Sequence, residues 1–415
     1  MAQFKRVIST ALKGLLAVVL VVAALPAVTG NQYIYRAFRA TYLMGHTTAN
    51  IDDAPVFDQR IVKAGTPQPW PVSPVYNQTP LPADLVAWHE QFGTAAWLVV
   101  HDGQVLQERY FAPYNAESRT NSFSMAKTVT TMLAGAAVAD GYLLSFDEPV
   151  SDFIQEWVRD PRGGKATFAQ FSAMSAGHNW TESYYLPLNP TAELYYGDQA
   201  EAQVLAAGFE RDPGKEYEYN SAGTQVLAVA LRRALQRKNP ELTLAQYFSE
   251  KFWVPLGMEH DAIWTVDRPD GMEKAFCCIY ATARDYAKLG QLLLQGGQWQ
   301  GKQLLDAGFI ARMSLPDLQP FYGHSLWMDH TYKHPFYLFQ GHLGQYIIVV
   351  PSEKLVVVRL GQTRDKDRAG EMLPKEIYRY VDAAVEAARQ AMPAAAPMAA
   401  PVAAPTAAAT PAPAG

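Results

Sequence analysis

The stretch Ser124-Met-Ala-Lys-Thr-Val-Thr-Thr-Met-Leu-Ala-Gly-Ala136 predicts an amphipathic helix that begins at a serine. Apolar residues recur at the spacing of one helical face, which consists of Met125, Val129, Met132, Leu133 and Ala136. Gly141 is expected to end the helix. Ser124 and Lys127 lie three residues apart, so the lysine amine can reach the serine hydroxyl on one side of the helix.

This serine and lysine form the first candidate site for chemistry. A serine hydroxyl is a weak nucleophile until a neighbouring base takes its proton. Burial lowers the pKa of a lysine and leaves a neutral amine that can act as that base, and the helix start adds free backbone N–H groups. However, Ser-x-x-Lys also arises by chance in a chain of 415 residues. The plainer interpretation is a helix-start serine beside a solvated lysine.

The sequence on both sides of this helix predicts strands. Upstream, a short helix over 81–92 precedes two apolar runs that flank Asp102-Gly103, a strong hairpin signal. Downstream, residues 346–350 and 355–360 predict a second hairpin, and a helical face begins near Pro374. The region between is mostly helical in pattern, with Asp147 expected to cap a helix that runs through Trp157. The predicted class is α/β in the α+β sense: an antiparallel sheet from both chain ends, flanked by N- and C-terminal helices, with an inserted all-helical domain.

The second candidate site is the segment from Pro213 to Thr224. A Pro-Gly turn leads into a short extended piece, and polar residues then precede a helix. Such a loop can direct the hydroxyl of Tyr219 and a neighbouring polar side chain into a cleft, where a tyrosine beside a lysine can carry protons. The plainer interpretation is a helix cap formed by Asn220 or Ser221 with a half-buried tyrosine.

The third candidate site is Gly341-His-Leu-Gly-Gln-Tyr346, at the start of the late hairpin. Glycines at the entrance of a strand let the backbone approach a ligand closely. A backbone N–H at this point can complete an oxyanion hole. An ordinary glycine-rich turn would have the same sequence pattern.

In this order, the three segments resemble the serine β-lactamase and penicillin-binding-protein superfamily. Its members carry Ser-x-x-Lys, then Tyr-x-Asn or a variant, then Lys-Thr-Gly or His-x-Gly, which match the segments at Ser124, Tyr219 and His342. The spacing is similar to that of the class C branch, and the resemblance covers roughly residues 81–390. Within the branch, the chain resembles 6-aminohexanoate-dimer hydrolases and related esterases. The resemblance implies a sheet flanked by terminal helices, a helical domain, and a cleft between them.

The resemblance also implies a role for each residue of the site. Ser124 would be acylated, Lys127 would accept its proton, and Tyr219 would pass the proton to the leaving group and later activate water. The N–H groups of Ser124 and Gln345 would hold the oxyanion. The implied substrate-binding residues are Ser221, Asn220, His342 and Gly344.

Two departures from the family pattern bear on the substrate. Ser221 stands where the family usually has Asn, and Asn220 could replace it only by pointing the other way. His342 replaces a lysine, so a permanent cation becomes a group that is mostly neutral at pH 7. We therefore expect a serine hydrolase that prefers small-molecule esters or simple amides and needs no cofactor. The alternatives are a D,D-peptidase or β-lactamase on the same scaffold, and a catalytically silent binding or sensor domain.

The two ends of the chain have distinct compositions. Residues 1–30 combine a basic start with an apolar run, which predicts a signal peptide or a membrane anchor, with membrane association through residues 7–28. Because the apolar run from Gly14 to Val28 spans only about 22 Å, a cleaved signal is the simpler interpretation. Both alternatives predict export, to the periplasm or to the periplasmic face of the inner membrane. Residues 31–80 read as an arm across the domain at 81–390, and residues 391–415 as an Ala/Pro-rich tail.

Composition excludes several classes of protein. The net charge of −5 provides no basic stripe for a nucleic acid. The only two cysteines, Cys277 and Cys278, are neighbours, which rules out a disulfide framework and a zinc cluster. The sequence does not indicate the oligomeric state.

Three further signals have plain interpretations. The stretch around Ser175 is a near match to a nucleophile elbow but follows a helical pattern, so a structural turn is expected. His330 and His334 have the spacing of a helical metal pair but lie in a predicted loop, so no metal site is expected. Four tyrosines could form a substrate lid or pack in the core: Tyr184, Tyr185, Tyr195 and Tyr196.

Overall fold

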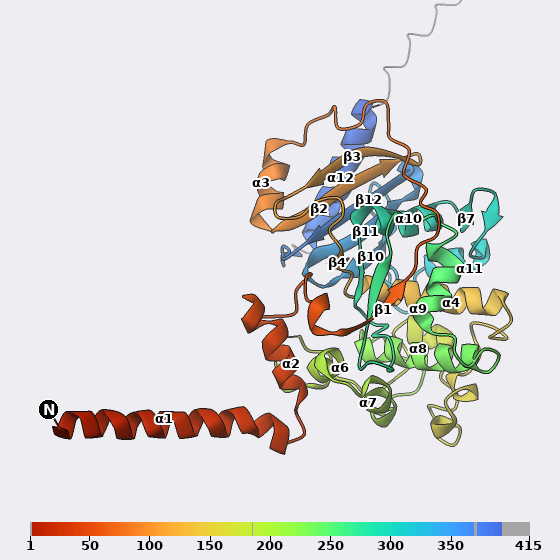
Figure 1. The fold of residues 1–415 in the computed structure, drawn as a ribbon. Helices are drawn as coiled ribbons and strands as arrows, with labels where there is room; N and C mark the ends of the chain where they lie inside the picture. Colours follow the sequence, from red (N-terminus) through yellow and green to blue (C-terminus); the bar gives the residue numbers. More distant parts are fainter. Residues whose placement is uncertain (1, 185, 369–371, 392–415) are drawn as a thin grey trace, which may run out of the picture.

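The computed structural model describes residues 2–184, 186–368 and 372–391. The predicted Ala/Pro tail lies outside the described residues except for Ala391, and Tyr185 also lies outside them. The predicted architecture is confirmed: an antiparallel sheet formed by both ends of the chain packs beside a helical region (Figure 1).

The main sheet has six strands in the order β3-β2-β12-β11-β10-β9, and all neighbouring pairs are antiparallel. Their bounds are β2 Thr94–His101, β3 Gln104–Tyr110, β9 Trp327–Asp329, β10 Phe336–Gly341, β11 Gln345–Val350 and β12 Leu355–Gly361. Asp102 and Gly103 both have positive φ, as a tight hairpin turn requires. The central pairing of β2 with β12 joins residues from opposite ends of the chain.

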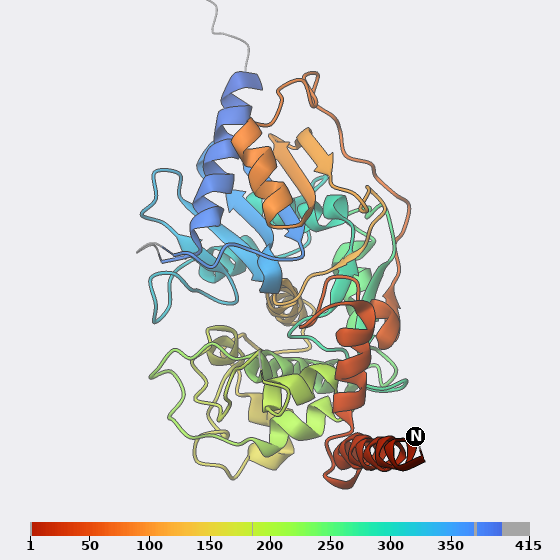
Figure 2. The same ribbon diagram turned by 90° about the vertical axis from the view of Figure 1, so that its left-hand side faces the viewer.

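Both faces of this sheet are covered, which explains the nearly continuous apolar runs of its strands. Trp97 and Val99 point to a core shared with α3 (Ala83–Gln91) and α12 (Lys375–Ala391). Leu98 and Val100 point to the opposite core, where α10 (Ala283–Leu294) packs on β11 and β12. Alternate residues of a strand face opposite sides, so burial on both sides demands apolar residues at every position. The two views show α3 and α12 on the same side of the sheet (Figures 1 and 2).

The helical region is built around α8, whose residues are buried along most of its length. Its helices are α4 Met125–Ala139, α5 Phe168–Ser172, α6 Pro190–Tyr196, α7 Ala200–Ala206, α8 Ser221–Gln236 and α9 Leu244–Phe248. A π-helical turn follows at Ser249–Trp253. The predicted end of the first helix is confirmed, since Asp140 is its C-cap and Gly141 follows with φ +69°. Outside this region lie α11 (Ala307–Met313) and the hairpin of β7 (Gln298–Trp299) and β8 (Lys302–Gln303).

The predicted helix from Asp147 through Trp157 is wrong. Two short 3-10 turns, Val150–Asp152 and Gln155–Trp157, take its place. The reason is pairing with a distant segment, because Val150 N–H donates to Ala166 O and Phe168 N–H donates to Glu148 O. These hydrogen bonds hold Pro149 in an extended conformation and prevent a continuous helix.

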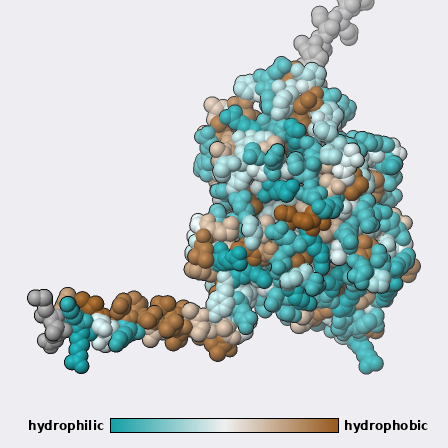
Figure 3. Space-filling model, in the orientation of Figure 1, coloured by the Kyte–Doolittle hydropathy of each residue, from teal (hydrophilic) through white to brown (hydrophobic). Residues whose placement is uncertain are grey.

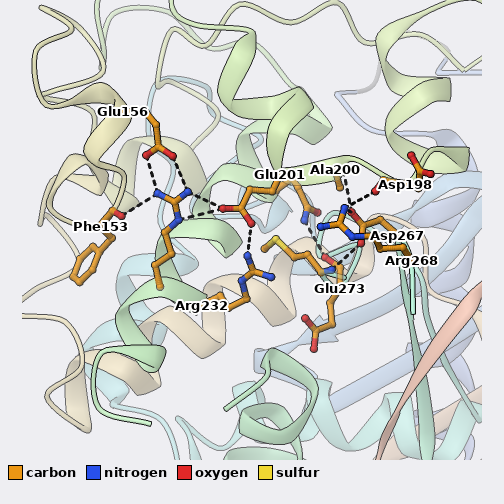
Figure 4. Close-up of polar contacts among 12 residues, drawn as sticks. Phe153, Glu156, Asp198, Ala200, Glu201, Arg232, Asp267, Arg268 and Glu273 are labelled. Atoms are coloured by element: carbon orange, nitrogen blue, oxygen red, sulfur yellow. Dashed lines mark hydrogen bonds and ion pairs between the residues drawn. The ribbon is translucent and has the colours of Figure 1, made fainter. Parts of the chain in front are cut away.

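An ion-pair network ties the periphery of the helical region to α8 (Figure 4). Arg233 on α8 forms two hydrogen bonds of 2.8 Å each with the carboxylate of Glu156 and two, of 2.7 and 3.2 Å, with Glu201 on α7. Glu201 also pairs with Arg232. The paired hydrogen bonds from Arg233 lower the pKa of Glu156 to about 2. One carboxylate therefore joins two arginines of α8 to α7.

The segment 31–80 is integrated into the domain. It contains α2 (Tyr33–Ala40), two 3-10 turns (Tyr42–Met44 and Ala54–Val56) and β1 (Asp58–Val62). β1 is the edge strand of a second sheet, in the order β1-β5-β6-β4, with β4 Thr120–Asn121, β5 Ala262–Val266 and β6 Ile279–Ala281.

Asp53 fixes this segment to the core, because its carboxylate accepts hydrogen bonds from Tyr280 (2.6 Å), Tyr195 (2.9 Å) and Asn121 (3.3 Å). The middle of the segment, at Asp53, thus reaches the same buried region that carries β4, directly before the Ser124 helix.

At the N-terminus, α1 (Ala2–Val28) projects from the body as a single exposed helix (Figure 1). Residues Phe4–Val28 are long and apolar enough to cross a membrane. At 1.5 Å per residue these 25 residues span about 37 Å, against about 30 Å for a hydrocarbon core. The helix is longer than the run from Gly14 to Val28 because apolar residues continue before Lys13.

Candidate active site

Ser124 lies at the start of α4, where the chain turns sharply out of β4. Phe123, directly before it, has φ +44°, and the side chain of Asn121 accepts the Phe123 N–H at 2.9 Å to hold that turn. A non-glycine residue in this conformation costs energy and persists only where its surroundings enforce it. Ser124 is half-buried and its side chain lines a pocket.

Lys127 lies under Ser124, 1 % exposed, and its amine is fully engaged. Nζ donates to Ser124 Oγ at 3.0 Å, to Ser221 Oγ at 3.1 Å and to the carbonyl oxygen of Phe276 at 3.0 Å. Burial lowers the pKa of Lys127 to about 8, while the nearby carboxylate of Glu182 raises it in part. Roughly a tenth of this amine is therefore neutral at pH 7, far more than for an ordinary lysine, and able to take a proton from Ser124.

Tyr219 completes the cluster from the extended piece before α8. Its ring centroid lies 5.1 Å from Lys127 Nζ, and its ring packs against Trp327. Burial raises the pKa of Tyr219, and a hydrogen bond with Ser124 lowers it in part. The structure thus brings Ser124, Lys127 and Tyr219 together from two separate segments.

The structure distinguishes between Ser221 and Asn220. Ser221 contacts Lys127 and lines the pocket, as the position of the family's Asn would. Asn220 is the N-cap of α8: its Oδ1 accepts the N–H of Gly223 at 2.7 Å and its Nδ2 donates to Glu218 O. Both polar atoms of Asn220 are used by the backbone around it, so the structure shows a capping role, and its expected substrate contact stays a prediction.

Gly341 lets the third segment approach the nucleophile turn. A Cβ on Gly341 would collide with the carbonyl oxygen of Ser122, so only glycine allows this approach. The side chain of Gln345 is fully buried and bonds the backbone of Gly361 in both directions, at 2.7 and 3.1 Å. These bonds fix the start of β11, which carries the predicted oxyanion N–H, beside the Ser124 turn.

His342 lines the pocket, while Gly344 does not. The His342 ring packs on Tyr184 and Phe123, with centroid distances of 5.2 and 5.5 Å. Burial lowers the pKa of His342 to about 4, so the imidazole is neutral at pH 7. Gly344 has φ +83° and packs against the guanidinium of Arg359, which donates a hydrogen bond to the Gly344 carbonyl oxygen. Gly344 therefore shapes the turn, and its expected substrate contact stays a prediction.

The pocket that reaches Ser124 has a volume of about 350 Å³. It is lined by residues of the helical region, of the His342 turn and of the N-terminal segment.

This arrangement can be compared with known proteins. A family model described as "Beta-lactamase" matches residues 83–380. The chain belongs to the beta-lactamase family. A 6-aminohexanoate-dimer hydrolase from Paenarthrobacter ureafaciens is 27 % identical over 240 residues, which cover 55 % of this chain and 58 % of that protein. The match thus spans less than two thirds of that relative.

Solved structures of similar proteins show the same beta-lactamase fold. A Bacillus anthracis protein provisionally named as a 6-aminohexanoate-dimer hydrolase superimposes with a TM-score of 0.66 at 23 % identity, covering 86 % of this chain and 94 % of that one. A family VIII carboxylesterase gives a TM-score of 0.58 at 17 % identity, with coverage of 78 % and 99 %. A penicillin-binding protein from Bacillus halodurans gives 0.54 at 16 %, with coverage of 73 % and 99 %. At these identities the likeness is one of fold.

In this member of the beta-lactamase family, Glu182 is a site residue that the sequence analysis missed. Its carboxylate accepts the hydroxyl of Ser221 at 2.6 Å, the Ser221 N–H at 2.9 Å and the hydroxyl of Tyr184 at 2.5 Å. It is the acidic group beside Lys127 that favours the protonated amine. No motif contains Glu182. The only feature of the sequence that could have pointed to it is its position two residues before Tyr184, at the start of the tyrosine-rich loop.

The tyrosines of that loop divide into two groups. All three described tyrosines line the pocket, but Tyr184 is 42 % exposed, whereas Tyr195 and Tyr196 are buried and contact each other edge to face. Tyr195 and Tyr196 pack in the core, and a lid role for Tyr184 stays a prediction.

The remaining signals in the sequence have structural roles. Ser175 lies in a turn after α5, and His334 pairs with Glu353 at 2.9 Å rather than standing in solvent. Within the described residues, no group of three or more metal-ligand side chains comes together. Cys277 and Cys278 are bonded to each other, which links neighbours only and leaves the expectation of no disulfide framework intact.

Proposed function

We propose that this member of the beta-lactamase family is an exported serine hydrolase that cleaves esters or simple amides through an acyl-enzyme on Ser124. One observation carries the proposal. A fully buried lysine amine with a depressed pKa lies 3.0 Å from a pocket-lining serine hydroxyl.

The first half of the reaction forms the acyl-enzyme. Neutral Lys127 takes the proton of Ser124 Oγ as this oxygen bonds to the substrate carbonyl carbon. The N–H groups of Ser124 and Gln345 hold the oxyanion, each such donor typically contributing about 3 kcal/mol. The bond between the carbonyl carbon and the leaving group breaks, and Tyr219 passes the proton to that group.

The second half returns the enzyme to its starting state. Water loses a proton to the same Lys127 and Tyr219 pair, bonds to the acyl carbon and releases the acid. Ser124 Oγ recovers its proton as its bond to the carbon breaks.

His342 supports the preference for esters or simple amides. The family's lysine provides a cation at this position, and here the imidazole is neutral and packed between two aromatic rings. The neutral imidazole of His342 therefore provides no positive charge to bind a substrate carboxylate. The names of the similar hydrolase and carboxylesterase agree with that preference.

The N-terminal helix supports export. Lys5, Arg6 and Lys13 precede or interrupt the first part of an exposed apolar helix, and basic residues stay on the cytoplasmic side of a membrane. This orientation supports a location outside the cytoplasm for the body, which follows the C-terminal end of the helix.

Covalent labelling tests the activity. A fluorophosphonate should add to the wild-type chain, as seen by intact mass, and Ser124→Ala should remove both the adduct and the hydrolysis of p-nitrophenyl esters. An unlabelled wild type would indicate a silent binding or sensor domain. Faster hydrolysis of nitrocefin than of p-nitrophenyl esters, or strong labelling by a fluorescent penicillin, would replace the ester preference with a β-lactamase or D,D-peptidase activity.

A further inference from the structure

Part of the lining of the pocket beside Ser124 comes from the N-terminal segment, outside the three candidate catalytic segments. Phe38 on α2, and Thr41 and Tyr42 just after it, line the same pocket as Phe123 and Ser124. The lining is mainly apolar. A pocket of this size and character fits an apolar group of a ligand.

The outer edge of this pocket is also apolar. We define the apolar rim as Phe38, Tyr42 and Leu186, which line the pocket yet remain 51 %, 62 % and 63 % exposed. Their chain neighbours Leu43 and Leu188 are 69 % and 64 % exposed. Large apolar side chains that gather around a pocket mark a site for an apolar partner.

The apolar rim lies beside the helix that can cross a membrane. α2 begins at Tyr33, five residues after α1 ends at Val28, and the two helices are in contact. Both views show α2 running across the axis of α1, on the side of the body from which α1 projects (Figures 1 and 2). Figure 3 shows apolar side chains along α1 and again on the adjoining edge of the body.

With α1 retained as a membrane anchor, this geometry would bring the pocket entrance close to the membrane surface. If α1 runs along the membrane normal, α2 lies along the membrane plane, and its eight residues extend only about 12 Å from the end of α1. A side chain such as Phe38 then meets the boundary between headgroups and acyl chains, where aromatic and leucine side chains are favoured.

We propose that the pocket takes the acyl chain of a long-chain, water-insoluble ester that enters from the membrane past the apolar rim. The inference rests on the proposed function, because the ester carbonyl must reach Ser124. The acyl half is assigned to the pocket because it stays bonded to Ser124 Oγ while the alcohol leaves with the transferred proton. Water then cleaves the acyl-oxygen bond and the fatty acid returns to the membrane.

The test uses the full chain reconstituted in phosphatidylcholine vesicles and a series of p-nitrophenyl esters. We expect kcat/KM to be at least about tenfold higher for the decanoate than for the acetate, because the extra methylenes leave water. Phe38→Ser should lower the decanoate value about fivefold or more and the acetate value by a clearly smaller factor, because only the longer chain reaches this side chain. Leu144→Ser, which changes an 88 % exposed leucine that does not line the pocket, should change neither.

A second arm tests entry from the membrane. p-Nitrophenyl palmitate should be cleaved faster when it is placed in the same vesicles as the enzyme than when it is placed in separate vesicles. Equal rates would overturn the membrane route. An acetate ester cleaved as well as the decanoate, or an equal loss on both esters in Phe38→Ser, would overturn the acyl-chain assignment.

Failure of the two proposals can be told apart. Hydrolysis that requires Ser124 but ignores chain length would remove the acyl-chain inference and keep the hydrolase. A chain that cleaves none of the esters and takes no fluorophosphonate would remove both.

Discussion

At the scale of single residues, the site depends on the charge of one amine. Lys127 is enclosed by three oxygen acceptors and burial lowers its pKa to about 8, well below the ordinary value of a lysine. The carboxylate of Glu182 favours the protonated form of Lys127, and the hydroxyl of Ser221 lies between the two groups and hydrogen-bonds to both. The geometry therefore places the proposed base and the carboxylate that raises its pKa in one hydrogen-bonded group.

The rate of hydrolysis should rise with pH. Lys127 accepts a proton only when neutral, so kcat/KM should increase about tenfold per pH unit well below pH 8 and level off above it. Initial rates with a p-nitrophenyl ester between pH 5.5 and 9.5 give the profile. A rate that falls across this range would exclude Lys127 as the base.

Replacement of Glu182 by Gln should move that profile to lower pH. The carboxylate raises the pKa of Lys127 and so partly offsets the lowering by burial. Without the carboxylate the pKa should fall further, and the amine becomes neutral at lower pH. The midpoint of the kcat/KM profile is the readout, because a lower overall rate from the lost Ser221 contact does not move it. Glu250→Gln, at an exposed position on another element, serves as the control. A midpoint that moves upward would contradict the arrangement.

At the scale of elements, Arg233 connects three elements of the helical region. It joins α8 to α7 and to the 3-10 turn that carries Glu156, in a network in which Arg233 and Glu201 are partly buried and Glu156 is exposed (Figure 4). Networks of this kind, with paired hydrogen bonds, hold elements together better than isolated surface pairs.

Arg233→Met should therefore destabilise the fold by about 1–3 kcal/mol. The cost arises because Glu156 and Glu201 lose their partner while the methionine keeps most of the packing. Arg312→Met is the matched control: it breaks a paired but exposed contact with Asp147 and should cost less than about 1 kcal/mol. Urea unfolding followed by circular dichroism measures both, and equal losses would show that the network adds nothing.

Local signals predicted much of the secondary structure. The Asp102-Gly103 turn, the late hairpin and the helix after Ser124 follow from turn chemistry and apolar period, and all three are present. The helix expected after Asp147 failed because its N–H and carbonyl groups bond with residues near 166, which no local pattern reveals.

In the site, motif order brought Ser124, Lys127 and Tyr219 to notice. Glu182 and Phe38 were not predicted, because no local pattern marks them. Only the tertiary structure shows that Glu182 contacts Ser221 and that Phe38 lines the pocket. A helix cap at α8 was expected from either Asn220 or Ser221, and Asn220 forms it. The hydroxyl of Ser221 instead donates to Glu182, which holds Ser221 toward Lys127.

At the scale of the whole molecule, the N-terminal segment is part of the core. Asp53 is fully buried and bonds three side chains from the region around β4 and β6. Burial raises its pKa to about 6, although the hydrogen bonds from Tyr280 and Tyr195 act in the opposite direction.

This buried carboxyl should give stability a distinct pH dependence. Because the pKa of Asp53 is higher in the folded chain, its contribution is fully present below about pH 4 and is lost as pH rises through about 6. Asp53→Asn removes this term, so the free energy of unfolding of the variant, relative to wild type, should rise by on the order of 2–3 kcal/mol between pH 4 and 7. Urea titrations at both pH values test it, with Asp58→Asn on the same segment as control. A difference that does not change with pH would contradict the assignment.

The pairing of β2 with β12 has a consequence for synthesis on the ribosome. The early hairpin of β2 and β3 emerges long before the strand that must lie beside it, because β12 begins only at Leu355. Until then the nascent chain exposes an unsatisfied strand edge, which is the kind of surface that aggregates. A chaperone that holds the polypeptide open would therefore benefit its biogenesis, and fragments that stop before Leu355 should accumulate as inclusion bodies.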